Sequence, residues 1–236
     1  NLKVEYQVLR KLLEHRVDAI ALIGLDHSAD TYKLLASQSV PVVAAWSYHE
    51  NAPISCIGAD NREAGLKAAE HLLSLGHRRI GFVFPPTDEN DRARGRLEAA
   101  KQAVKEAGID IPEAWNIQSL YSIAQSKAAC INLLGQGHQL TALICGNDII
   151  AQGAVSGAMQ LGLHIPTDLS IIGIGDFAGS ADLYPALSTV QIPAQEIGAR
   201  AGQYLVDRIA NVDRGFEVIQ KSKVAVTLRI RGTTAT

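Results

Sequence analysis

Residues 141–175 are TALICGNDIIAQGAVSGAMQLGLHIPTDLSIIGIG, and they contain the repeating unit of the fold. The apolar run Thr141–Gly146 is typical of a buried strand. Apolar residues at helical spacing follow over Asp148–Leu161, and Gly162 is a common type of helix end. The run Leu169–Ile174 predicts a second strand. Strand, helix and strand in this order indicate a parallel sheet with a right-handed crossover.

The same alternation covers the rest of the chain. Further helices are predicted over residues 4–13, 62–75, 97–107, 123–134 and 195–209, with a short one at 34–35, and further strands over 17–24, 40–45, 79–84 and 224–230. This order is typical of α/β proteins, whose ligand sites lie beyond the carboxyl ends of the strands. No linker rich in Pro, Gly or Ser divides the sequence, so two lobes would require several chain crossings.

Composition narrows the class of protein. The 236 residues are 47% hydrophobic and 19% charged, which excludes an intrinsically disordered chain. With 22 Lys and Arg against 24 Asp and Glu, the net charge of -2 is unlike that of a chain that binds DNA through phosphate contacts. No apolar run approaches the roughly 20 residues of a membrane span. Three cysteines without CxxC spacing fit a reducing compartment. Since the sequence begins at Asn1 and its one methionine is Met159, we expect a preceding segment.

Motifs for catalysis or metal binding are not found in the sequence. The seven histidines have no metal-ligand spacing, and no nucleophile motif occurs, so neither a metal site nor an enzyme is predicted. The loop Gly173–Gly179 has the spacing of a dinucleotide-binding loop, yet Pro185 follows soon and no helix is predicted after it. A nucleotide-binding enzyme is therefore a minor alternative to a plain glycine-rich loop.

Polar residues near predicted strand ends are the candidates for binding. The segment Asp88–Arg96 is interpreted as a solvated loop, in which Arg92 and Arg94 face water, whereas Arg96 lies where a helix begins. A guanidinium there can make bidentate hydrogen bonds to a hydroxyl pair or a carboxylate. After the strand at 141–146, Asp148 suits a helix cap, and the Asn147 amide could bind a polyol or be structural.

Several segments, in order, resemble the ligand-binding core of the LacI/GalR family of bacterial transcription regulators. The similar segments are LEHRVDAIALI (13–23), DNREAGLKAAEHLLSLGHRRIGF (60–82), GRLEAAKQAVKEAG (95–108), TALICGNDIIAQG (141–153), LGLHIPTDLSIIG (161–173) and PALSTV (185–190). Ala99 and Ala100 depart from the Gly and aromatic residue usual in the third segment. The resemblance covers nearly the whole chain.

The resemblance implies two similar Rossmann-like lobes of parallel sheet flanked by helices, joined by three crossing strands, with the effector between them. The first lobe would comprise about residues 1–73 and 194–221, and the second about 76–191 and 222–236. The family carries a helix-turn-helix headpiece before this core. Neither that headpiece nor the first strand and helix of the core is expected in this chain, which is thus truncated at its N-terminus relative to the family.

The resemblance also implies an effector site. Asp60, Arg96 and Asn147 match the family's acidic, arginine and asparagine contacts, and Tyr121 lies near the position of a stacking aromatic residue. A further acidic contact of the family falls at Gly175, so this sequence departs from the pattern and has Asp176 one residue later. Trp46, predicted just past a strand end, either stacks on the ligand or is simply partly buried.

The implied function is that of an effector-binding and dimerisation core in a cytoplasmic regulator. Its DNA affinity would be switched by a small sugar or sugar acid, with some likeness to the gluconate-type branch at residues 41–61. The expected partners are the effector, a second copy of the chain, and operator DNA through the headpiece only, with no cofactor, metal or membrane. The alternative is a periplasmic sugar-binding protein of a transport system, which shares the fold.

Overall fold

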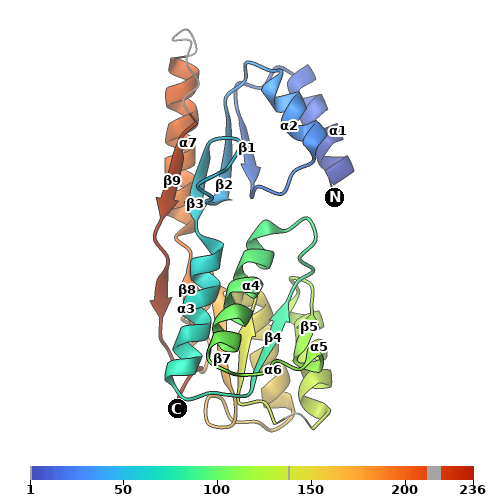
Figure 1. Ribbon diagram of the computed structural model, residues 1–236, viewed down its shortest axis with the longest axis vertical. Helices are drawn as coiled ribbons and strands as arrows, with labels where there is room; N and C mark the ends of the chain where they lie inside the picture. The colour runs from blue at the N-terminus through green and yellow to red at the C-terminus, as the bar shows by residue number, and fades with distance from the viewer. Residues whose placement is uncertain (1, 138, 212–218) are drawn as a thin grey trace. The chain divides into compact units, whose positions relative to one another are not determined.

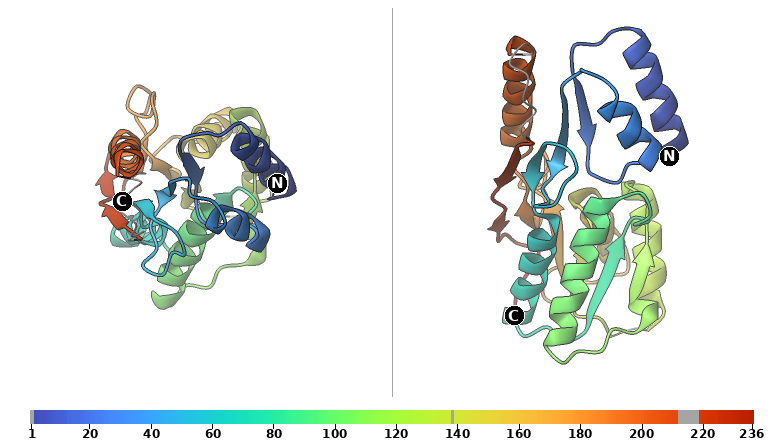
Figure 2. Two further views of the ribbon diagram at one scale, coloured as in Figure 1. Left: turned by 90° about the horizontal axis from the view of Figure 1, so that it is seen from above. Right: turned by 45° about the horizontal axis from the view of Figure 1, so that its top comes forward.

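The computed structural model describes residues 2–137, 139–211 and 219–236, and the chain divides into two compact units. The first unit comprises residues 1–60, 88–91 and 193–225, and the second comprises 61–87, 92–192 and 226–236. Figures 1 and 2 show that each unit is a sheet with helices packed on it. The α/β class expected from the sequence is confirmed.

The first unit has a sheet in the order β1-β2-β3-β9, with every pair parallel. Its strands are β1 (Ile20–Ile23), β2 (Val42–Ser47), β3 (Cys56–Ala59) and β9 (Lys221–Val224), and its helices are α1 (Leu2–Glu14), α2 (Ala29–Ala36) and α7 (Ala194–Ala210). Ile20 and Leu22 of β1 pack with Leu9 of α1 and Leu35 of α2, because alternate strand residues face the same side. Helix α7 packs on β2 and β3.

The second unit has a six-stranded sheet in the order β10-β8-β7-β6-β4-β5, in which only the β10–β8 pair is antiparallel. Its strands are β4 (Ile80–Phe84), β5 (Asn116–Gln118), β6 (Ala142–Cys145), β7 (Ser170–Gly175), β8 (Ser188–Gln191) and β10 (Thr227–Arg229). Its helices are α3 (Asn61–Ser74), α4 (Asp91–Glu106), α5 (Ile123–Gly135) and α6 (Asp148–Gln160), with a 3-10 turn at Glu113–Trp115. The first residue of α4, Asp91, still belongs to the first unit. The central strands β4, β6 and β7 are buried throughout, which explains their continuous apolar sequences.

Helix α4 corrects one interpretation of the sequence. It begins at Asp91, six residues before the predicted helix, so Arg92 and Arg94 are half-buried helical residues and not part of a solvated loop. The first turns contain mostly charged residues, and this composition concealed the helical pattern. Ala93, which is 1% exposed, is the apolar residue that this stretch contributes to the core.

Three short strands were not predicted, and one predicted strand is two. Strands β3, β5 and β8 have three or four residues each and lack a long apolar run. The predicted strand 224–230 covers only the last residue of β9, which pairs with β3, and the whole of β10, which pairs with β8. The chain passes from the first unit to the second between these two strands, after Ala225. Composition does not reveal such a change of pairing partner.

The boundary between the units falls after Asp60, earlier than the expected boundary near residue 73. Helix α3 packs against β7 and β8 and is therefore part of the second unit. Within the described residues, no helix combines the length and the apolar character that a membrane crossing requires.

Candidate functional site

Arg96 is the central charged residue at the carboxyl ends of the strands in the second unit. Its side chain is buried, with 5% of the residue exposed. The Nε atom donates to Asn61 Oδ1 at 2.8 Å, and Nη1 donates to the Gly146 carbonyl at 2.9 Å. Gly146 directly follows β6, so the guanidinium is held beside the end of that strand. Asn61, which holds it, was not predicted to do so.

Gly65 is what allows Arg96 to reach these partners. A Cβ atom at Gly65 would lie 2.0 Å from the backbone oxygen of Arg96 and 2.7 Å from its carbonyl carbon. Helices α3 and α4 therefore cross with their backbones in direct contact. This crossing brings Asn61, the first residue of α3, within hydrogen-bonding distance of Arg96.

Asn147 and Asp148 both lie at the start of α6. Asn147 is the N-cap of α6, and its Oδ1 accepts the Ile150 amide at 3.0 Å. The interpretation of Asp148 as the helix cap is wrong: it is the first helical residue and is 0% exposed. Since Arg96 is bonded to Gly146, the structure brings Arg96 and Asn147 to the same strand end.

Both oxygens of the Asp176 carboxylate accept hydrogen bonds from other side chains. Its Oδ1 pairs with Arg231 Nη2 at 2.7 Å, and its Oδ2 accepts Gln191 Nε2 at 2.9 Å. Asp176 has φ 58°, a left-handed conformation that is uncommon for residues other than glycine. The loop that begins here is bonded to Asp148 through the Phe177 amide at 2.8 Å, so it lies next to Asn147 in the same unit.

Tyr121 lies in the turn between β5 and α5 and is 51% exposed. Ser122, the next residue, is the N-cap of α5. Stacking of the Tyr121 ring on a ligand stays a prediction.

Trp46 belongs to the first unit and lies within β2, not just past its end. It is half-buried and has φ 77°, although it pairs with Gly58 as part of a parallel ladder. A Cβ at Gly58 would lie 2.4 Å from both Trp46 C and Ser47 N, so this backbone approach requires glycine. A bulky residue in a left-handed conformation at a strand end is a common feature of functional sites.

Asp60 and Asp91 add carboxylates to the carboxyl edge of the sheet in the first unit. Asp60 follows β3, and Lys223 Nζ lies 3.4 Å from its Oδ2. Asp91 Oδ2 accepts Ser47 Oγ at 2.6 Å and the Leu25 amide at 3.1 Å, although the sequence had placed Asp91 in a solvated segment. This edge presents acceptors suited to the hydroxyl groups of a polyol.

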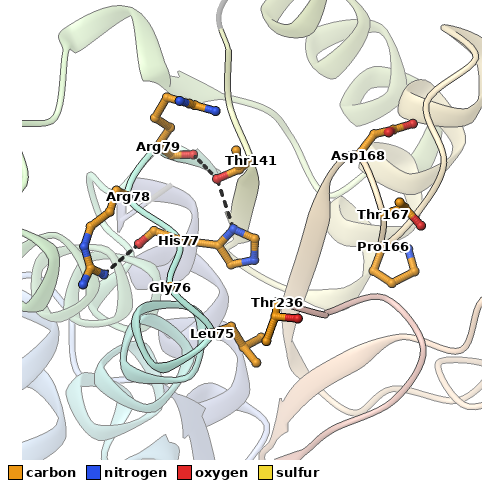
Figure 3. A pocket seen from close by; sticks show the side chains of 10 residues that line it. All are labelled: Leu75, Gly76, His77, Arg78, Arg79, Thr141, Pro166, Thr167, Asp168 and Thr236. Carbon is orange, nitrogen blue, oxygen red and sulfur yellow. Dashed lines mark hydrogen bonds between the residues drawn. The ribbon is translucent and has the colours of Figure 1, made fainter.

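A cavity lies at the opposite, amino-terminal edge of the sheet in the second unit (Figure 3). Its volume is about 400 Å³, and it is lined by Leu75, Gly76, His77, Arg78, Arg79, Thr141, Pro166, Thr167, Asp168 and Thr236. The His77 ring contacts Thr141 Oγ1 and the Ala235 carbonyl, both at 3.0 Å. In the described ranges no group of three or more His, Cys, Asp or Glu residues could hold a metal ion.

We expect acid to destabilise the second unit through His71, which is buried, and His77, which is half-buried. Burial lowers the pKa of His71 and of His77 below the usual 6.5. Well above pH 6.5 both imidazoles are neutral in the folded and the unfolded chain. As the pH falls through 6.5 the unfolded chain binds more protons than the folded chain, so the free energy of unfolding decreases as the pH decreases. His71 also bonds Thr234 Oγ1 at 2.9 Å.

Urea unfolding at pH 5.5 and 7.5, monitored by Trp115 fluorescence in a Trp46→Phe background, measures this loss for the second unit. The variants His71→Gln and His77→Gln should each reduce it, whereas His15→Gln, which changes an exposed histidine of α1's C-terminal turn, should not. An equal pH dependence in all four proteins would contradict the assignment.

Comparisons with known proteins give one consistent result. A family model described as a periplasmic binding protein-like domain matches residues 69–234. The HTH-type transcriptional repressor PurR of Escherichia coli O1:K1 / APEC is 32% identical over 213 residues, which are 89% of this chain and 62% of the repressor. The chain thus spans less than two thirds of the length of that relative.

Solved structures of regulators have the same fold. Transcription regulator GntR from Chromobacterium violaceum is 28% identical with a TM-score of 0.89, over 99% of this chain and 84% of that one. A sugar-binding transcriptional regulator of the LacI family from Escherichia coli, complexed with phosphate, is 26% identical with a TM-score of 0.83, over 99% and 83%. These relatives are regulators and not enzymes. The chain belongs to the LacI/GalR family and corresponds to its periplasmic-binding-protein-like core.

Proposed function

We propose that this chain is the effector-binding and dimerisation core of a bacterial transcription regulator whose DNA affinity is switched by a small sugar or sugar acid. The observation that carries the proposal is the buried guanidinium of Arg96, held by Asn61 and Gly146 beside Asn147. Family membership supports the regulator over a transport protein, because the relatives compared above are transcription regulators.

The chemistry of the candidate residues suits a polyol. Arginine and asparagine in the second unit supply donors and an amide acceptor, while Asp60 in the first unit supplies a carboxylate that accepts hydroxyl protons. A guanidinium also recognises a carboxylate, which extends the ligand class to sugar acids. Trp46 and Tyr121 are the candidate stacking residues, since sugar rings present apolar C–H faces to aromatic side chains. Because Arg231 and Gln191 bind Asp176, we propose that it acts mainly by shaping its loop.

Switching requires only that the effector binds one conformation of the protein better than another. DNA contacts would come from a helix-turn-helix headpiece, in keeping with the HTH-type name of the repressor relative, and the cell compartment would be the cytoplasm. The protein would work without a cofactor and without a membrane. An isologous dimer would set the spacing of the two DNA half-sites.

Isothermal titration calorimetry tests the ligand class. Gluconate, glucuronate, glucose, galactose and ribose would be titrated into the chain, together with NAD and NADP, which test the minor nucleotide-binding alternative. We expect saturable binding of at least one sugar or sugar acid and none of the nucleotides. Binding of a nucleotide alone would overturn the proposal in favour of the glycine-rich loop at residues 173–179.

We expect the chain to form a homodimer without DNA. Closed twofold symmetry is the commonest arrangement of soluble homo-oligomers. Exposed apolar side chains such as Tyr184, at 93% exposure, and Met159, at 51%, are present on the second unit. Sedimentation velocity at micromolar concentration should give twice the mass of one chain. A single species of one-chain mass at up to 100 µM would contradict the dimerisation part of the proposal.

A further inference from the structure

Asp148 is a buried carboxylate that the effector contacts proposed above do not use. It is 0% exposed and accepts three hydrogen bonds. Oδ2 accepts the Phe177 amide at 2.8 Å and Ser180 Oγ at 2.7 Å, and Oδ1 accepts Thr189 Oγ1 at 2.6 Å. All three donors are neutral, although buried carboxylates usually face a cation. Burial raises the pKa of Asp148, and the three hydrogen bonds oppose the rise.

The neighbouring strand is shaped to admit this carboxylate. A Cβ atom at Gly173 of β7 would lie 2.3 Å from Asp148 Oδ1 and 3.3 Å from its Cα. Any side chain at residue 173 would therefore displace Asp148. The absence of that side chain lets the first turn of α6 lie directly against β7, so the carboxylate reaches both the loop after β7 and Thr189 of β8.

The loop that receives these bonds contains a strained residue. Asp176 has φ 58°, and such a conformation persists only where the surrounding contacts determine it. The Phe177 amide, bonded to Asp148, is the next backbone group along the chain. Ser180, bonded to the same oxygen, closes the turn by donating its amide to the Phe177 carbonyl at 3.0 Å. One carboxylate thus fixes both ends of the 177–180 turn.

We propose that Asp148 is a positioning residue of the effector site, which holds the 176–180 loop in place beside Asn147; this inference rests on the function proposed above. Asp148 acts through its hydrogen bonds to the loop and makes no contact with the ligand. Its charge matters less than its acceptor atoms. Asparagine should therefore be able to perform the same role. In Asp148→Asn, Oδ1 can accept the Phe177 and Ser180 donors, and Nδ2 can donate to the Thr189 hydroxyl oxygen.

Hydrogen exchange of the free protein tests the loop directly. In Asp148→Ala the Phe177 and Ser180 amides should exchange about tenfold faster or more, while amides in the central strands β4 and β6 keep their protection. Asp148→Asn should restore most of the protection. The control Asp168→Ala removes a carboxylate that accepts the His164 amide at 2.7 Å in another loop of the same unit, and it should leave residues 176–180 unchanged.

Affinity for gluconate, measured by calorimetry, is the second readout. Asp148→Ala should weaken binding about tenfold or more, and Asp148→Asn should bind within about threefold of the wild type. An equal loss of affinity in Asp148→Ala and Asp148→Asn would show that the charge of Asp148 acts on the ligand, and would overturn the positioning role. Faster exchange throughout the second unit with unchanged affinity would reduce Asp148 to a stabilising residue, and would also overturn it.

Two milder variants cover the case in which Asp148→Ala does not fold. Ser180→Ala and Thr189→Val each remove one hydrogen-bond donor to Asp148. Ser180→Ala should speed hydrogen exchange at residues 177–180. Thr189→Val should speed it less, because Thr189 donates to Oδ1, whereas the loop donates to Oδ2. If the wild type binds none of the five sugars and sugar acids named above, the ligand class proposed above fails, and loop exchange alone then decides the inference. Unchanged loop exchange in these variants would overturn it.

Discussion

Replacing Arg96 with alanine should weaken effector binding by roughly 10- to 1000-fold. Hydrogen bonds that involve a charged group contribute ~1.5–3 kcal/mol each, and ~1.4 kcal/mol corresponds to a factor of ten in affinity. Arg96→Lys should also be impaired, because an ammonium cannot reproduce the planar fork of donors. Calorimetric titration with whichever sugar or sugar acid binds the wild type measures both losses.

Because Arg96 is buried, its replacement should also lower the stability of the protein. In Arg96→Ala the Asn61 side-chain oxygen and the Gly146 carbonyl lose the donors that they have now, so we expect the free energy of unfolding to fall by ~1–3 kcal/mol. Lys105→Ala, which changes an exposed cation on the same helix, is the matched control and should change neither quantity much. If Arg92→Ala abolished binding while Arg96→Ala bound normally, the match of Arg96 to the family's arginine would be wrong.

Substituting Gly65 with alanine should be the most destabilising single methyl addition in α3. The new Cβ would lie 2.0, 2.7 and 2.8 Å from three backbone atoms of Arg96, and backbone atoms cannot move aside as a side-chain end can. Helix α4 must shift as a whole, and overpacking of this kind costs about 1–3 kcal/mol or more. The shift also separates Arg96 from Asn61, so effector affinity should fall together with the melting temperature.

Gly198→Ala is the matched control for this change. Gly198 is also inside a helix, α7, and a Cβ there meets no atom within 4 Å. This substitution should raise the free energy of unfolding by roughly 0.5–1 kcal/mol, because alanine is the better helix former. Thermal unfolding of the two variants should therefore shift in opposite directions. A Gly65→Ala protein as stable as the wild type would show that α3 and α4 do not cross closely in solution.

The long apolar strands and amphipathic helices were predictable because their burial imposes a simple period on the sequence. Strand β6 and helix α6 fall within one or two residues of the predicted bounds. Strand β8 was not predicted because its buried residues Ser188 and Thr189 bear hydroxyl groups, and hydrogen bonds to Thr234 and Asp148 satisfy them. A partner far along the chain leaves no local signal.

The candidate site was predictable to a similar degree. Arg96 could be selected by its place at a predicted helix start and Asn147 by its place after a predicted strand, and the structure brings them to one strand end. Asn61 and Asp148 could not, because each resembles an ordinary helix-start residue in sequence. Their buried contacts depend on the close helix crossing at Gly65 and on the space left at Gly173, which are properties of the assembled unit.

The late position of β9 and β10 in the chain has a consequence for biosynthesis. The first unit obtains its last strand only when residues 221–224 have left the ribosome, after nearly the whole second unit has been translated. Until then the β3 edge lacks its parallel neighbour, and unpaired strand edges favour pairing with other chains. We therefore expect a nascent chain that stalls before Lys221 to aggregate more readily than the complete chain.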